Sequence, residues 1–244
     1  MRVRLFMLLF LAAGSVAAQK ISTAVVPVVG SVFGATMVRW KTDVELVNDT
    51  GRATDVALEL PLAPGLAEFA VTMAAGQSLR FPDIAQAFSL EHVLSPLRVT
   101  TSGRRSVSVR ASVYAIRDGG EPSPTQPLSV FIGSPFHPSR VLDGLAFSEE
   151  FRTNIGLVNL SDRDADFVLA LQRLPGRTMA VSQIRVRAGS MAHASIQSLF
   201  PLITEGSGFN VIVETGARDT YVYASVIEST THTGRFISPR PGAR

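Results

Sequence analysis

The chain reads WKTDVELVN at residues 40–48 and FRTNIGLVN at residues 151–159. Four of the nine positions are identical and four more exchange residues of like kind, so Glu45 against Gly156 is the one unlike pair. Two landmarks follow each stretch in the same order, a Pro-Gly pair at 64–65 and 175–176 and an alternating run at 107–113 and 220–226. An ordered repeat of this length predicts two copies of one folding unit.

Both stretches alternate with the period of two that is typical of a half-buried β-strand. The residues at 40, 42, 44 and 46 are expected to face a core, and those at 151, 153, 155 and 157 keep the same phase. Runs at 54–60 and 167–171 come next, each ending near a Pro-Gly turn. Several short strands separated by turn signals favour a β-sandwich. We therefore predict an all-β fold of two tandem immunoglobulin-like β-sandwich domains.

One short capping helix is expected in each copy. Asp83 and Ser195 are residue types that cap helix N-termini, and each precedes apolar residues at helical spacing that end at Phe88 and Phe200. So short a helix cannot persist alone, and we expect the two aromatic rings to dock it over the open end of the core.

The stretch 118–127 is rich in Gly and Pro and interrupts every period, which predicts a linker between domains at 21–117 and 128–238. Residues 1–18 combine a basic start, an apolar run and a small-residue tail, the pattern of a cleaved signal peptide. The apolar run is far shorter than the roughly 20 residues of a membrane span. These features predict a periplasmic or extracellular protein with no membrane span after leader cleavage.

The charge balance gives no indication of a nucleic-acid partner. The chain has 23 Lys+Arg and 20 Asp+Glu, and loss of Arg2 and Arg4 with the leader leaves 21 against 20, a net charge of +1. Cysteine is absent, so the fold must be held by burial without disulfides.

Three segments of the chain carry a resemblance to a known group of proteins. The strand at 151–159, the capped turn ending at Phe200 and the run at 223–227 resemble bacterial secreted proteins built from paired immunoglobulin-like β-sandwich repeats. The resemblance covers nearly all of residues 21–238 and implies an extracytoplasmic, non-catalytic protein. Similar proteins tend to carry acidic residues in the final hairpin, where this chain reads ESTTHTG at 228–234, a departure that weakens any metal role there.

Signals for chemistry are sparse. The four histidines stand far apart, and no nucleophile elbow, phosphate loop or paired zinc-ligand motif is present. Asp162, Asp164 and Asp166 are the best metal candidates, because alternate carboxylates can converge on calcium, although a polar hairpin tip is the plainer interpretation. Asn48 and Asn159 match a glycosylation pattern, but Asn after a strand also starts a turn, which would explain why both copies have it.

Two surfaces are predicted to bind. Tyr221, Tyr223 and Ile227 alternate on the outward side of the last strand, where exposed aromatic rings could stack on a sugar or anchor a protein. The alternative is that this face packs against the other domain or a covering loop. The second candidate is a long, partly apolar loop at 134–150 that includes Phe136 and His137.

These features favour a non-catalytic binding or structural module of the cell envelope or extracellular space, whose partner is an envelope protein or polysaccharide. One alternative is a hydrolase of extracellular polymers, with Asp143, Glu149 or Glu150 acting near His137. Another is an accessory subunit that donates a strand, since 24–29 is apolar and Pro27 suits an edge strand, although ordinary pairing within its own sheet is the plainer interpretation.

Overall fold

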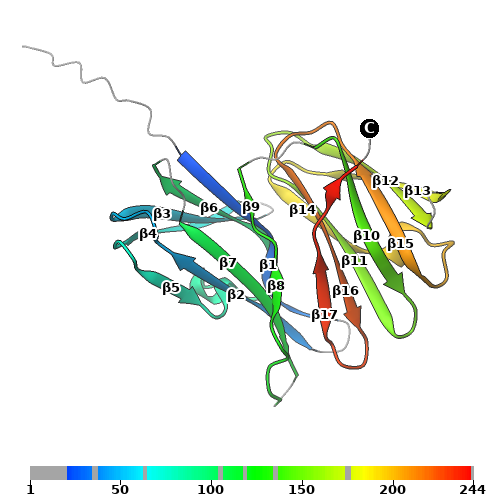
Figure 1. Cartoon of the computed structure of the whole chain (residues 1–244), viewed down its shortest axis with the longest axis horizontal. Helices are drawn as coiled ribbons and strands as arrows, with labels where there is room; N and C mark the ends of the chain where they lie inside the picture. The colour runs from blue at the N-terminus through cyan, green and yellow to red at the C-terminus, as the bar shows by residue number, and fades with distance from the viewer. Residues whose placement is uncertain are drawn as a thin grey trace, which may run out of the picture.

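The computed structural model describes residues 21–34, 38–62, 65–103, 107–117, 120–133, 137–173 and 177–242. The predicted leader, the start of the linker, Phe136 and the second Pro-Gly turn lie outside these ranges. Figure 1 shows two groups of strands side by side, with β1 (Ile21–Phe33) of the first group near the middle of the molecule.

The first half is a single nine-stranded sheet. Its other strands are β2 (Arg39–Val47), β3 (Thr54–Pro61), β4 (Leu66–Met73), β5 (Ser78–Phe81), β6 (Val93–Ser102), β7 (Ser108–Ile116), β8 (Gln126–Leu128) and β9 (Phe131–Ile132). The strand order is β4-β3-β6-β1-β2-β7-β8, with β5 paired to β2 and β9 paired to β1. Since β1 pairs with β6 and with β2, it continues one layer of the half into the other.

The second half divides the same layers into two sheets. Its strands are β10 (Ser139–Phe147), β11 (Phe151–Asn159), β12 (Ala165–Arg173), β13 (Arg177–Val186), β14 (Ser190–Ser195), β15 (Gly206–Glu214), β16 (Thr220–Glu228), β17 (Gly234–Ile237) and β18 (Arg240–Pro241). One sheet runs β13-β12-β15-β10-β18 and the other β14-β11-β16-β17.

The two halves have the same strand order. The order β4-β3-β6-β1 of the first half matches β13-β12-β15-β10 of the second, and β5-β2-β7-β8 matches β14-β11-β16-β17. Register agrees residue by residue: Glu45 pairs with Arg80 and Arg110, while Gly156 at the aligned position pairs with His193 and Tyr223.

Each half has its own apolar core between two layers. In the second half the core includes Phe167 of β12, Phe209 of β15 and Val222 of β16, all at most 1% exposed. In the first half Leu46, Leu58 and Leu97 are fully buried in the corresponding core. The prediction of an all-β, sandwich-type fold is therefore confirmed.

Asn48 and Asn159 hold matching turns. The Nδ2 of Asn48 donates to the carbonyls of Arg52, Met73 and Ala74 at 2.8–2.9 Å, and its Oδ1 accepts from the backbone and side chain of Thr50. Asn159 makes the corresponding set with the carbonyls of 163, 186 and 187 and with the residue at 161. Both side chains are fully buried, which supports the turn interpretation and leaves no room for a glycan.

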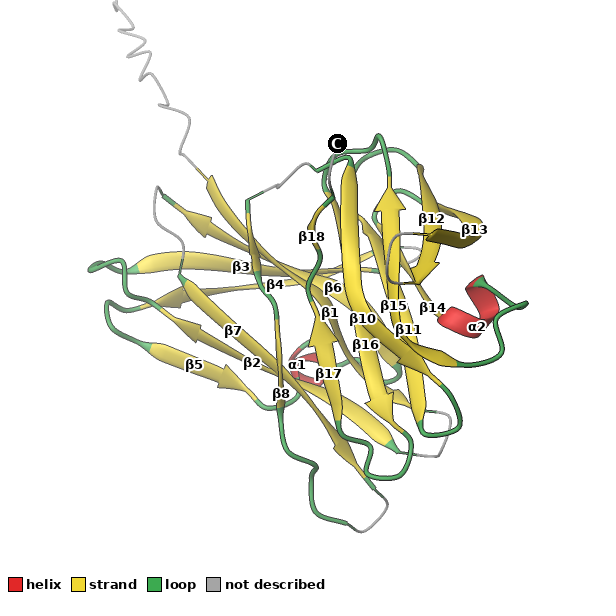
Figure 2. Ribbon diagram, turned by 45° about the vertical axis from the view of Figure 1, so that its right-hand side comes forward, coloured by secondary structure: helices red, strands yellow, loops and turns green. Residues whose placement is uncertain are grey.

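Both expected helices are present, α1 (Ile84–Ala87) and α2 (Ile196–Leu199), and Figure 2 shows α2 at the outer side of its half. Ser195 caps α2 by accepting from Ser198 N at 3.1 Å. The side chain of Asp83 does not cap α1, contrary to the prediction, because its carboxylate is held by Lys41 at 2.9 Å.

Residues 24–26 and 29 pair with β6, and 24–25 also pair with β9, so ordinary pairing within the sheet is observed for this stretch in place of a free edge. Pro27 sits where the register shifts between Val26 and Val29. One prediction about local structure is wrong. Residues 139–147 are not a loop but the core strand β10. The physical reason is that Leu142, Leu145 and Phe147 bury their side chains in the second core.

The two halves are in direct contact. Val25 of β1 belongs to one buried cluster with Val158, Leu160, Tyr221 and Tyr223 of the second half. Across the same junction Arg98 donates to Leu160 O at 3.3 Å and Arg117 to Thr230 O at 2.9 Å. Strands β8 and β9 lie in the sheet of the first half. The domain boundaries at 21–117 and 128–238 remain predictions from the sequence.

Candidate functional site

A cavity of about 410 Å³ lies where the two halves meet. Its walls come from β1, β2, β6, β7 and β8 of the first half and from β11, β14, β16 and β17 of the second. A ligand bound here would contact both halves at once, so this cavity is the principal candidate site.

The cavity combines aromatic and polar walls. Trp40 and Phe33 line it from the first half, and Tyr223 and Phe236 from the second. Polar groups come from Gln126, Asn154, Ser225, Arg152 and His193. Among the lining residues that the structure describes none is Asp or Glu, so the site favours a neutral or anionic ligand with an apolar face.

Tyr223 forms the floor of the cavity. Its ring stacks on Phe236 with centroids 5.1 Å apart and planes inclined by 14°, and only 1% of the residue is exposed. The hydroxyl is hydrogen-bonded to His193 Nδ1 at 2.8 Å in a partly buried contact. Burial raises the pKa of Tyr223 well above its ordinary value, so the hydroxyl stays protonated and available as a hydrogen-bonding group.

Tyr221 and Tyr223 are buried, so the last strand has no open aromatic face at these residues, and the alternative that the face packs against other parts of the molecule describes the structure. Tyr221 packs on Phe131 with ring centroids 5.3 Å apart and donates to Gly133 O at 3.1 Å. Burial raises its pKa to about 12. Tyr223 and Ile227 still share one site, because both line the cavity between the halves.

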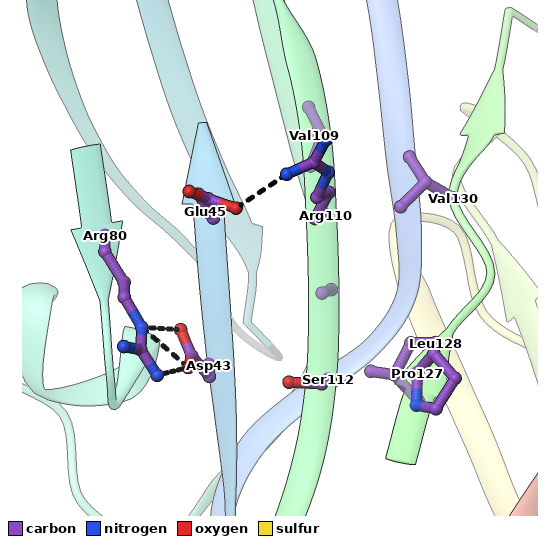
Figure 3. Close-up of a pocket in the computed structure, with 10 residues that line it drawn as sticks. Asp43, Glu45, Arg80, Val109, Arg110, Ser112, Pro127, Leu128 and Val130 are labelled. Atoms are coloured by element: carbon purple, nitrogen blue, oxygen red, sulfur yellow. Dashed lines mark hydrogen bonds and ion pairs between the residues drawn. The ribbon is translucent and has the colours of Figure 1, made fainter. Parts of the chain in front are cut away.

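The aligned face of the first half has a different chemistry. There Arg80 binds Asp43 through Nε and Nη2 at 2.9 and 2.5 Å, and Arg110 Nη1 lies 3.3 Å from Glu45 Oε2 (Figure 3). These four residues line a depression of about 580 Å³ beside Pro127, Leu128 and Val130. The aligned residues of the second half include Asn154, His193 and Tyr223, which line the cavity.

The second predicted binding surface is only partly described. His137 is exposed and lines a separate small pocket of about 180 Å³ together with Tyr221. The structure therefore places two of the predicted binding residues at one pocket, apart from Ile227 and Tyr223. Phe136 lies outside the described residues.

The candidate calcium ligands are not gathered into a site. Asp166 is bound by Arg185 through two contacts of 2.8 Å, and Asp164 accepts from the backbone N–H of Ala188 at 3.1 Å. Within the described ranges no group of three or more His, Asp or Glu side chains is placed to hold a metal ion. The geometry thus gives Asp166 an ion pair and Asp164 a backbone contact, while Asp162 is exposed.

The carboxylates considered for hydrolysis are placed as follows. Asp143 is ion-paired with Arg240 on β18, and Glu149 and Glu150 are exposed at the turn after β10. Asp43 and Glu45 do line one depression, but each is bound by an arginine.

Most of the cavity could not be identified from the sequence. Trp40 and Phe33 lie in the first half, and Arg152 and Asn154 lie about a hundred residues further along the chain. One signal pointed to the site: Gly156 is the only unlike position of the repeat, and it pairs with Tyr223 beneath the cavity.

Comparison with known proteins adds little about activity. No family model and no curated protein matches the chain. Weak structural matches include Bacteroides uniformis β-glucuronidase 2 covalently bound to cyclophellitol-6-carboxylate aziridine, at 10% identity and a TM-score of 0.17, and a second Bacteroides uniformis β-glucuronidase structure, at 12% identity and a TM-score of 0.18. Both matches cover 83% of this chain but only 25% of the larger protein. At these TM-scores the similarity supports no conclusion about the function of this chain. Within residues 21–242, where the structure describes them, no helix is long and apolar enough to cross a bilayer.

Proposed function

We propose that this protein is a secreted, non-catalytic binding module of the cell envelope or extracellular space, and that its ligand occupies the cavity between the two halves. The observation that carries the proposal is the lining of the cavity, in which aromatic rings from both halves surround amide, hydroxyl and guanidinium groups. Such a mixture suits a ligand with both apolar and hydrogen-bonding faces, as a sugar has. We therefore favour an envelope polysaccharide as the partner.

The non-catalytic part of the proposal has separate support. Lining residues of the cavity provide no described carboxylate for acid–base chemistry, and the carboxylates of the first half are bound by arginines. A screen of purified protein against envelope and extracellular polysaccharides is expected to release no reducing ends. Hydrolysis of any of them would contradict the proposal.

Binding can be tested with a cavity-filling variant and a matched control. Ser225 lines the cavity and pairs with Asn154, while Ser112 pairs with Asp43 at the aligned position of the first half. Ser225→Phe is expected to fill the cavity, and Ser112→Phe is expected to leave it open. Retention on envelope from the source cells is measured for both variants, with parallel envelope samples stripped of protein or of polysaccharide.

The sole tryptophan provides a second readout. Because Trp40 lines the cavity and the chain contains one Trp, its fluorescence should change when a polysaccharide fraction enters the site. We expect retention and fluorescence change to be lost in Ser225→Phe and kept in Ser112→Phe. If Ser225→Phe binds envelope as the unmodified protein does, the cavity is not the binding site.

A further inference from the structure

Arg140 on β10 is a buried cation with no carboxylate partner. Only 5% of the residue is exposed, and its Nη1 and Nη2 both donate to the one hydroxyl oxygen of Thr220, at 3.2 and 3.1 Å. Across the described part of the chain Arg140 takes part in no ion pair of 4 Å or less. Five arginines with greater exposure than Arg140 do form such pairs. The most buried of these guanidinium groups is thus the one that lacks an anion.

Burial without a counterion disfavours the charged form. It lowers the pKa of Arg140, and no carboxylate offsets this effect. A guanidinium group nevertheless stays protonated in proteins, so the charge persists at a cost to folding stability. A single hydroxyl group satisfies few of its five N–H donors. An anion bound to Arg140 would supply both the missing countercharge and acceptors for the remaining N–H donors.

The pocket beside Arg140 has room for such an anion. Its volume is about 180 Å³, below the range of roughly 300–1,000 Å³ that is typical of sites for whole drug-sized ligands. His137 and Arg240 line it in addition to Arg140, and the described lining contains no Asp or Glu. Thr220 and Tyr221 also line it, but their hydroxyls are already bonded to Arg140 and to Gly133 O. Since Arg240 is engaged by Asp143, Arg140 and His137 are the groups left for a ligand.

We propose that this pocket is a second binding site, which takes a small oxyanion group such as phosphate, sulfate or carboxylate. The planar guanidinium of Arg140 would donate from its remaining N–H groups to two oxygens of the anion, and His137 would contact it at the exposed end of the pocket. The site is distinct from the cavity between the halves, and it does not depend on the function proposed for that cavity.

The test uses sodium phosphate, sodium sulfate and sodium acetate as probes, with sodium chloride at equal ionic strength as reference. Thermal unfolding midpoints are measured for the full protein, for Arg140→Met and for Arg185→Met, an exposed arginine outside the pocket. We expect a saturable rise for at least one oxyanion in the unmodified protein and in Arg185→Met. In Arg140→Met the affinity should fall by about tenfold or more, since hydrogen bonds to a charged group are lost.

Phosphate and sulfate also stabilise folded proteins by exclusion from their surfaces, so the informative quantity is the difference between variants. Equal oxyanion-dependent rises in the unmodified protein and Arg140→Met would overturn the proposal, as would the absence of a saturable rise from every probe. Should Arg140→Met fail to fold, His137→Ala tests the same pocket at an exposed position. It should weaken the response, and an unchanged response would then overturn the proposal.

Discussion

The ring of Tyr223 lies against Gly156, in space that a β-carbon would otherwise occupy. A Cβ on Gly156 would overlap two carbons of the ring and lie 2.6 Å from a third, Cδ1. At the aligned positions of the first half, Glu45 and Arg110 are ion-paired at 3.3 Å on an open face. The loss of one side chain at position 156 thus permits a flat aromatic surface in the second half, where the first half has a charged one.

The first prediction is that Gly156→Ala destabilises the protein. Tyr223 is buried and stacked on Phe236, so the ring cannot move aside without disturbing the junction of the halves. We expect a loss of about 1–3 kcal/mol in the free energy of unfolding, measured by denaturant titration. Gly216→Ala is the matched control, because a Cβ there meets nothing within 4 Å. Equal effects of the two substitutions would show that Gly156 is not needed for this packing.

The sandwich layers could be predicted because several strands that face a single core, such as β3 and β12, alternate. Thr42, Val44 and Leu46 are buried as that pattern requires, and the repeated Asn after each strand holds the turn expected of it. Strand β10 escaped prediction for a local reason. Gly144 has a φ of 68° and the register shifts on both sides of Leu145, so the apolar residues of β10 lose their period of two.

Contact between the halves was predicted only as an alternative, because alternation does not reveal what covers the second face of a strand. Every residue of β16 from Thr220 to Ala224 is buried, which is typical of a strand covered on both sides. The matching stretch of β7 carries Ser108 and Arg110 in place of Tyr221 and Tyr223. That difference marks the covered face, but it does not say whether a ligand or the other half covers it.

The second prediction concerns the buried asparagines. Asn48→Ala and Asn159→Ala each remove donors to three backbone carbonyls, so both should lower the free energy of unfolding by about 2–4 kcal/mol. Denaturant titration measures both losses. Asn154→Ala, on the cavity wall in the same strand as Asn159, is the control and should change stability little. If either buried Asn behaves like Asn154, its hydrogen bonds do not contribute as the geometry indicates.

The third prediction follows from the ion pair that replaces the helix cap at Asp83. The side chain of Asp83 is 8% exposed and that of Lys41 20%, and Asp83 Oδ1 is buried without a hydrogen-bond partner. Lys41→Met would leave a buried carboxylate unpaired, and we expect a loss of about 1–3 kcal/mol by thermal or denaturant unfolding. Arg110→Met removes the exposed partner of Glu45 and should have no measurable effect. Similar losses for the two variants would show that the buried ion pair contributes no more to stability than the exposed one.

The fourth prediction is a loss of stability at mildly acidic pH. Burial lowers the pKa of His193 and of His232, and the nearby Arg117 and Arg152 lower that of His232 further. Because the unfolded chain has histidine pKa values of about 6.5, it takes up protons before the folded protein does as the pH falls. The free energy of unfolding should therefore be constant above about pH 7 and decrease from about pH 6.5 toward pH 5.5, above the range in which most carboxylates titrate.

Thermal unfolding across this range should show a smaller decrease for the His193→Gln/His232→Gln double variant than for the unmodified protein. The two single variants would divide the effect between the histidines, and an undiminished decrease in the double variant would assign the pH dependence to other groups.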